Sequence, residues 1–267
     1  MEILISAGGT SERIDNVRSI TNGSTGLLGR HIAEAFAATG RVGRIWYVCG
    51  RAAAAPAAEI AEIVRIGDVS ELIAAVRDIC GRRDIGAAVH AMAVSDYAVS
   101  YVSSAAAIAE SVERRLALAG PEGREAAGGL RRLIEEGVAD AAAFGRDGKI
   151  PSDVDDLAVF LRRAPKVLPM LRGMAPGAVI VGFKLLDGAA REALMDAARR
   201  LLRDSGCDFV LANDLAEISG ERHPGYLLGG DGSCLPFGSK AEIAEGIARA
   251  VMEAAAARAY SRKEQGG

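Results

Sequence analysis

Short apolar runs alternate with amphipathic stretches along most of the chain. Five apolar runs predict buried strands, over residues 2–6, 44–49, 85–90, 178–181 and 209–212. Apolar residues spaced three or four apart predict helices, over residues 27–40, 69–80, 189–204 and 239–258. Because most of the strands are separated by helices, the pattern predicts an α/β fold, Rossmann-like, with a largely parallel sheet flanked by helices.

Two segments depart from this alternation. Residues 226–228 and 234–237 flank a Gly-Gly-Asp-Gly turn and predict a late β-hairpin. The stretch 103–148 is rich in Ala, Arg and Glu and is interrupted by glycines, which predicts a helical insertion of two or three helices. No stretch has the composition of a linker, so we expect a single domain over residues 1–267.

Composition narrows the class of protein. The 267 residues carry 32 Lys plus Arg against 35 Asp plus Glu, without a dense basic stripe, so nucleic-acid binding is not expected. No apolar run is long enough to span a membrane, and the first residues lack the features of an export signal, so we expect a cytoplasmic protein. The four cysteines lie far apart and form no C-x-x-C pair, and we expect no side-chain metal site.

Two loops and three lysines are candidates for binding phosphate. Gly8 and Gly9 end the first strand, where a glycine turn brings backbone N–H groups close to a ligand. Ser24 or Thr25 is expected to cap the first helix, whose N-terminus is an anion site. Only five of the basic residues are lysines, and we expect three of them to stand in loops marked by glycine or proline: Lys149, Lys166 and Lys184.

The loop Gly23–Gly29 permits two other interpretations. An NAD(P)-dependent short-chain reductase or epimerase would use it for the dinucleotide, although a long loop separates it from the first strand and no lysine completes a Tyr-x-x-x-Lys pair. A nucleotide-sensing protein without catalysis is the other alternative, because fold does not fix function.

A wider set of segments is more specific. Residues 7–26, Ala-Gly-Gly-Thr-Ser-Glu-Arg-Ile-Asp-Asn-Val-Arg-Ser-Ile-Thr-Asn-Gly-Ser-Thr-Gly, resemble the opening of phosphopantothenate–cysteine ligase. Four further segments follow in that family's order: 90–97, 148–152, 181–186 and 211–215. The resemblance covers nearly the whole chain apart from much of 103–148. It looks closest to the monofunctional bacterial type, because no flavin-dependent decarboxylase domain precedes residue 1.

The resemblance implies an activity in coenzyme A biosynthesis. 4'-Phosphopantothenate would attack a nucleoside triphosphate to form an acyl-nucleotide and pyrophosphate, and the amine of cysteine would then displace the nucleotide. The resemblance also implies Mg²⁺ as cofactor and a homodimer. CTP is the expected nucleotide, and ATP is the second choice. The helix near residues 198–204 departs from the family, because it has arginines where relatives that prefer cytidine carry lysines.

The resemblance assigns roles residue by residue. Asn22 would hold the carbonyl of the acyl-nucleotide, and Lys149 would stabilise charge during acyl transfer. Pro151 departs from the family's Lys-Ile-Ser-Ser and stiffens the loop of Lys149. Arg18, Ala93 and Asn22 would bind the substrate. The nucleotide would contact Gly8, Gly9, Thr10, Ser24, Gly26, His90, Ala91, Met92, Asp96, Lys149, Pro165, Lys166, Val167, Leu168, Phe183 and Lys184.

Overall fold

The computed structural model describes residues 1–126, 128–144, 148–220 and 222–265. Within it the chain forms two compact units. The sheet unit comprises Met1–Ser11, Thr21–Ser95 and Pro165–Gly267, and the ladder unit comprises Glu12–Ile20 and Asp96–Ala164. A single domain over residues 1–267 stays a prediction.

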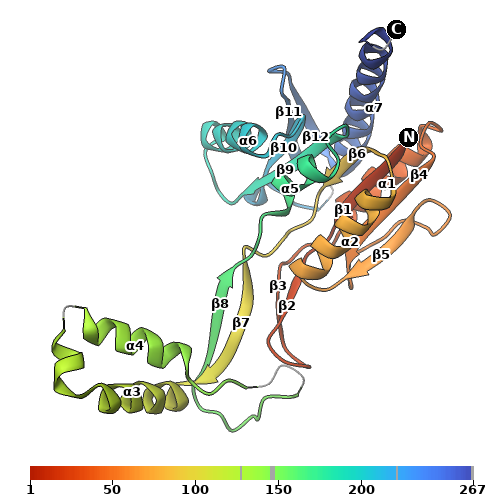
Figure 1. Cartoon of the computed structure of the whole chain (residues 1–267). Coiled ribbons are helices and arrows are strands. Elements are labelled where there is room, and N and C mark those ends of the chain that lie inside the picture. Colours follow the sequence, from red (N-terminus) through yellow and green to blue (C-terminus); the bar gives the residue numbers. More distant parts are fainter. Residues whose placement is uncertain (127, 145–147, 221, 266–267) are drawn as a thin grey trace. The chain divides into compact units, whose positions relative to one another are not determined.

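The sheet unit is built on an eight-stranded sheet with the order β12-β11-β10-β9-β6-β1-β4-β5 (Figure 1). The strands from β10 to β5 pair in parallel, and β11 and β12 continue the sheet antiparallel. This confirms the Rossmann-like α/β fold and the late hairpin. The strands are β1 Glu2–Ala7, β4 Arg44–Gly50, β5 Glu62–Ile66, β6 Ile85–His90, β9 Val179–Leu186, β10 Phe209–Asp214, β11 Arg222–Gly229 and β12 Cys234–Ser239.

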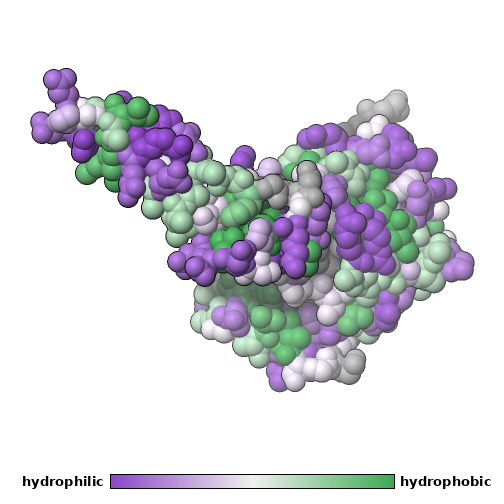
Figure 2. All heavy atoms as spheres, turned by 90° about the horizontal axis from the view of Figure 1, so that it is seen from below, coloured by the Kyte–Doolittle hydropathy of each residue, from purple (hydrophilic) through white to green (hydrophobic). Residues whose placement is uncertain are grey.

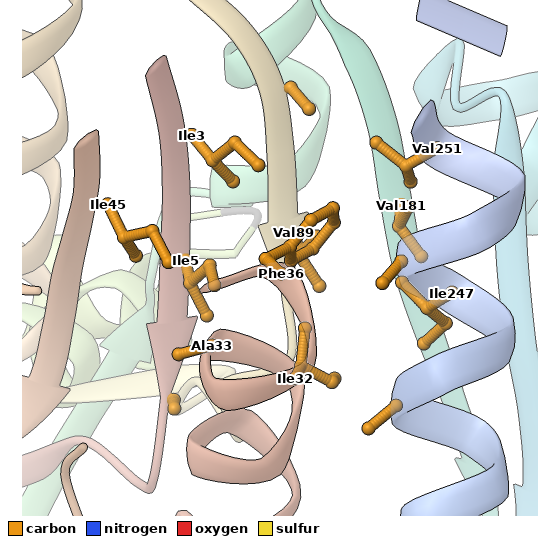
Figure 3. Close-up of a cluster of buried hydrophobic side chains, with 14 of the residues drawn as sticks. Ile3, Ile5, Ile32, Ala33, Phe36, Ile45, Val89, Val181, Ile247 and Val251 are labelled. Atoms are coloured by element: carbon orange, nitrogen blue, oxygen red, sulfur yellow. The ribbon is translucent and has the colours of Figure 1, made fainter. Parts of the chain in front are cut away.

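Helices cover both faces of this sheet. α1 (Leu27–Ala38) and α7 (Lys240–Gln265) pack on one face and on each other, whereas α2 (Val69–Arg82), α5 (Val167–Met174) and α6 (Arg191–Ser205) pack on the other. Alternate residues of each strand face α1 and α7, because successive side chains of a strand point to opposite faces. Figure 3 shows the resulting cluster, which includes Ile3, Ile5, Ile32, Phe36, Ile45, Val89, Val181, Ile247 and Val251. Each of the larger side chains contributes about 1.5–3 kcal/mol to stability.

The start of α1 differs from the sequence-based expectation. Its N-cap is Gly26 and not Ser24 or Thr25, but Thr25 Oγ1 accepts a hydrogen bond from Leu27 N–H, the first of the helix, over 3.4 Å. Gly26 has a φ of 75°, and a Cβ there would lie 2.9 Å from Cβ of Ala53. Backbone conformation and close packing both require glycine at this position.

The ladder unit contains the helical insertion and an antiparallel pair of strands. β7 (Tyr97–Ser104) pairs with β8 (Leu157–Arg163), and between them run α3 (Ala105–Glu125) and α4 (Gly129–Ala139), which pack on each other. α3 is kinked at Gly120, whose φ is 64°, just before Pro121. A small core forms around Val99, Val102 and Ile150.

Two further elements complete the described structure. Short strands β2 (Ser11–Arg13) and β3 (Ser19–Thr21) form a separate two-stranded sheet. A 3₁₀ turn of the sheet unit, η1, spans Leu215–Glu217.

Across the described ranges, no helix combines the length and apolar composition that crossing a membrane requires.

Candidate active site

The order in which strands join the sheet reverses between β1 and β6. From β1 the chain adds β4 and β5 on one side, and then returns to add β6, β9 and β10 on the other. In open α/β sheets ligands bind where the strand order reverses in this way, outside the carboxyl ends of the strands. The loops that follow β1 and β6 hold the predicted residues Gly8–Thr10 and Ala91–Ala93.

The glycine loop after β1 brings the loop after β6 and the segment around Asn22 together. Gly9 forms a parallel bridge with Ala93, and Thr10 N–H donates to the Ala93 carbonyl over 3.1 Å. A Cβ on Gly9 would lie 2.1 Å from the carbonyl oxygen of Asn22, so only glycine permits this approach. Gly8 has a φ of 80° and packs against Ala53. Gly9 therefore allows the backbone of Asn22 to lie against the end of β1, where Asn22 N–H donates to the Thr10 carbonyl over 3.1 Å.

The Asn22 amide points at Ala93, which the sequence also predicts to bind the substrate. Asn22 Nδ2 donates to the Ala93 carbonyl over 3.2 Å, and the side chain is half-buried. An amide nitrogen carries two N–H groups. The bond to Ala93 orients the amide and leaves a second N–H for the oxygen of a ligand. The catalytic role of Asn22 stays a prediction, but the structure places its amide beside Ala93.

A buried hydroxyl pair ties the same two loops together. Thr10 Oγ1 lies 2.9 Å from Ser95 Oγ and accepts a hydrogen bond from Ser95 N–H, also over 2.9 Å. Both residues are buried. A role for Ser95 could not be predicted, because a serine after a strand is also common in ordinary turns. The Thr10 hydroxyl thus forms hydrogen bonds within the protein. A contact between Thr10 and the nucleotide stays a prediction.

His90 ends β6 in a buried position. Its Nδ1 lies 2.6 Å from Ser6 Oγ of β1, and burial lowers the pKa of the imidazole to about 4. His90 is therefore neutral near pH 7, and its ring joins two central strands. This geometry agrees with a structural role for the imidazole.

The buried state of His90 makes stability depend on pH. Its pKa is lowered in the folded protein, so the unfolded chain takes up the proton first, and stability is lost as the pH falls from about 6.5 toward 4. We expect His90 to account for a decrease of about 3 kcal/mol in the free energy of unfolding over that range. Urea titrations at several pH values should give a flatter profile for His90→Asn than for wild type. A profile for His90→Asn as steep as that of wild type would contradict the prediction.

The other predicted nucleotide residues of the sheet unit lie on several elements. Ser24 is half-buried just before α1, and Phe183 and Lys184 are half-buried within β9. Pro165 and Lys166 are exposed before α5, whereas Val167 and Leu168 are buried in its first turn. Leu168 packs against Gly182, where a Cβ would lie 2.7 Å from Leu168 Cδ2. The side chains of Val167 and Leu168 therefore belong to the core, and only their backbone is suited to contact a nucleotide.

Three predicted residues belong to the ladder unit. Arg18 is half-buried, and its Nη2 donates to the Ile150 carbonyl over 2.9 Å. Lys149 and Asp96 are exposed, and the Asp96 carbonyl accepts a bond from Ala164 N–H. Asp15, for which the sequence analysis predicted no role, is buried in the segment that carries Arg18. A single acidic residue after Ile14 is too common a pattern to indicate a buried carboxylate.

The structure also bears on the reductase interpretation. The dinucleotide fingerprint requires the first strand to run directly into the glycine loop of the following helix. Here β2 and β3 come between β1 and α1, and Gly29 packs against Ala7, where a Cβ would lie 2.3 Å from the Ala7 Cβ. Gly29 therefore allows α1 to pack closely on β1, and the two intervening strands are the feature that departs from the dinucleotide fingerprint.

No group of three or more His, Cys, Asp or Glu side chains in the described part of the chain is arranged to hold a metal ion. Mg²⁺ usually keeps several waters and binds one or two carboxylates together with substrate phosphates. A site of that kind needs no group of three side chains.

Comparison with known proteins identifies similar chains. The model of the DNA/pantothenate metabolism flavoprotein C-terminal domain matches residues 1–119 and 137–255. Coenzyme A biosynthesis bifunctional protein CoaBC from Thermococcus kodakarensis is 27% identical over 91% of this chain and 49% of its own length. The protein of the same name from Mycobacterium tuberculosis is 30% identical over 94% of this chain and 52% of its own. The chain thus spans about half the length of these relatives.

Solved structures resemble this one across most of the chain. The DNA/pantothenate metabolism flavoprotein from Streptococcus pneumoniae superposes with a TM-score of 0.75 at 28% identity, over 95% of this chain and 99% of that one. A Cab2 variant in complex with phosphopantothenate-cysteine gives a TM-score of 0.67 at 18% identity, over 98% of this chain and 88% of that one. At that identity the second likeness shows the fold.

Proposed function

The chain belongs to the family of DNA/pantothenate metabolism flavoprotein C-terminal domains, and on that basis we propose that it is a phosphopantothenate–cysteine ligase acting in coenzyme A biosynthesis. The observation that carries the proposal is the position of the Asn22 amide beside the carboxyl ends of β1 and β6. The amide bonds to the Ala93 carbonyl, and the backbone of Asn22 lies against Gly9. The names of the CoaBC relatives and the ligand of the Cab2 variant support the same reaction.

The reaction has two steps. A carboxylate oxygen of 4'-phosphopantothenate attacks the α-phosphorus of the nucleoside triphosphate, and pyrophosphate leaves. The amine of cysteine then attacks the acyl carbon, loses a proton, and displaces the nucleoside monophosphate. Negative charge moves onto phosphate oxygens in both steps, so fixed N–H groups and cations provide most of the catalysis. No side chain needs to act as a nucleophile.

The proposed roles follow the properties of each group. The Asn22 amide donates to the acyl-nucleotide without competing for a proton. Lys149 supplies a compact positive charge, and Arg18 holds a phosphate or carboxylate of the substrate. Glycine N–H groups at Gly8 and Gly9 and the N-terminus of α1 bind phosphate, and Phe183 offers a face to the base. Bound Mg²⁺ would neutralise the phosphates, with Asp96 as a carboxylate near the nucleotide.

The experiment that tests this function is a pyrophosphate release assay. Purified protein is supplied with 4'-phosphopantothenate, Mg²⁺ and either CTP or ATP, with and without cysteine. We expect cysteine-dependent formation of pyrophosphate and of the amide product, with CTP preferred over ATP. No product with either nucleotide would refute the ligase. A shift of NADPH fluorescence on mixing with the protein would instead favour the reductase.

We also propose that the protein forms a homodimer through the ladder unit. β7 and β8 form a two-stranded ladder, which is marginal in stability unless something covers it. Tyr97 and Leu161 of these strands are 51% and 46% exposed. Over the surface in general, Figure 2 shows hydrophobic residues interspersed with hydrophilic ones on the face in view. A second copy of the ladder would satisfy these open edges.

Light scattering on a sizing column tests the dimer. We expect twice the mass of one chain for wild type, and a shift toward one chain for Leu161→Asp, because a charge on the ladder opposes pairing. A wild-type mass of one chain at a concentration of tens of micromolar would contradict this proposal without affecting the ligase assay.

A further inference from the structure

Asp15 is a buried carboxylate in a short turn of the ladder unit. It is 1% exposed, and Asp15 Oδ1 accepts hydrogen bonds from the N–H groups of Val17 and Arg18, each over 2.7 Å. Its other oxygen, Oδ2, accepts a bond from Ile150 N–H over 3.1 Å. The carboxylate therefore joins two segments that are 135 residues apart in the sequence.

Hydrogen bonds and a neighbouring cation stabilise the negative charge of Asp15. Burial alone would raise its pKa, but the bonds from three backbone N–H groups and the nearby charge of Arg18 hold the pKa below its ordinary value. Arg18 Nε lies 3.6 Å from Asp15 Oδ2. A buried carboxylate that accepts several N–H bonds stays ionised near neutral pH.

The same turn holds the chain on both sides of Lys149. Asn16 N–H donates to the Gly148 carbonyl over 3.2 Å, and Arg18 Nη2 donates to the Ile150 carbonyl. The Ile150 side chain is 2% exposed and packs in the small core of this unit. The Lys149 side chain itself is exposed. Its backbone is thus fixed while its ammonium group is available to a ligand.

Pro151 does not disturb this arrangement. Proline lacks an N–H, but the bonds that hold the segment use the N–H and carbonyl of Ile150. The departure from the family pattern at residue 151 therefore leaves the attachment of Lys149 intact.

We propose that Asp15 is a positioning residue for Lys149, acting through the N–H of Ile150. The inference rests on the proposed function for the role of Lys149. Asp15 accepts hydrogen bonds from the N–H of Ile150, the residue after Lys149, and from the N–H of Arg18. One carboxylate thus fixes the backbone next to Lys149 and that of Arg18. Asp15 itself needs no contact with the substrate.

The variant Asp15→Asn tests this role, because it keeps the size of the side chain and removes one acceptor oxygen. The amide can no longer accept from all three N–H groups, and its NH₂ faces a donor. We expect cleavage by trypsin after Lys149 in the full chain to accelerate about tenfold or more, because a buried N–H without a partner favours local opening. We also expect kcat of ligation to fall about tenfold or more, with KM for the nucleotide within about threefold of wild type.

The matched control is Asp155→Asn, which changes an exposed carboxylate in the same unit. It should leave the cleavage rate and kcat unchanged. Unchanged cleavage after Lys149 in Asp15→Asn would overturn the inference, and so would an equal rise at Arg131 of α4, because Asp15 would then only stabilise the unit. An inactive wild-type protein would refute the ligase, while the cleavage pattern would still test how Asp15 holds Lys149.

Discussion

Replacement of Lys149 by glutamine is expected to lower kcat of ligation by about 100- to 1000-fold, the range found when one group that stabilises developing charge is removed. Glutamine retains much of the length of the side chain but carries no charge. The loss should fall mainly on acyl transfer, in which negative charge moves onto the phosphate of the departing nucleoside monophosphate. The Kd for the nucleotide should change much less, because glycine N–H groups and other cations also bind the phosphates.

Two measurements check the Lys149 prediction. Product formation under saturating substrates gives kcat, and calorimetric titration with CTP gives the Kd. Lys240→Gln is the matched control, because Lys240 begins α7 and lies outside the candidate site. If Lys149→Gln retained wild-type turnover, Lys149 would have no role in acyl transfer. A non-catalytic nucleotide sensor would have no turnover to lose.

Replacement of Asn22 by alanine is expected to have an effect of similar size, a decrease in kcat of about 100- to 1000-fold. The Asn22 amide bonds to the Ala93 carbonyl, and its backbone is held against Gly9. Alanine removes the side-chain donor but leaves the backbone contacts. The melting temperature should therefore change little, whereas catalysis should lose the group that meets the acyl-nucleotide.

The Asn22 prediction is measured by kcat together with thermal unfolding. Thr21→Ala, one residue earlier in the exposed strand β3, is a suitable control and should keep both values near wild type. A fall in melting temperature that accounts for the lost activity would assign Asn22 a structural role. Wild-type kcat in Asn22→Ala would show that the amide does not act on the intermediate.

The central sheet could be predicted because its signals are local. The run that forms β6 is apolar over nearly all its length, and the prediction of residues 85–90 matches Ile85–His90. β5 was missed because Glu62 and Arg65 interrupt its apolar residues at the edge of the sheet. β7 and β8 were missed because the partner of each lies far along the chain, and only pairing distinguishes such strands from loops.

The glycine turn after the first strand could be predicted from the sequence, but the contacts it makes could not. Gly9, Asn22 and Ala93 lie together because the glycine loop after β1 allows close approach, and their roles stay predictions. Asp15 and Ser95 could not be assigned from the sequence, since their importance lies in bonds to Ile150 and Thr10. Partners this far apart in the sequence are known only once the chain has folded.

The points at which the helical insertion leaves and rejoins the strand ladder lie side by side. Ser103 Oγ donates to the Ala142 carbonyl over 2.7 Å, and Phe144 N–H donates to the Val102 carbonyl over 2.8 Å. The family match passes over residues 120–136, which fall within this excursion. The family pattern still covers residues 105–119 of α3, so the part of the two helices that lies outside it is the far end of the excursion, where a change of length need not alter the register of β7 and β8.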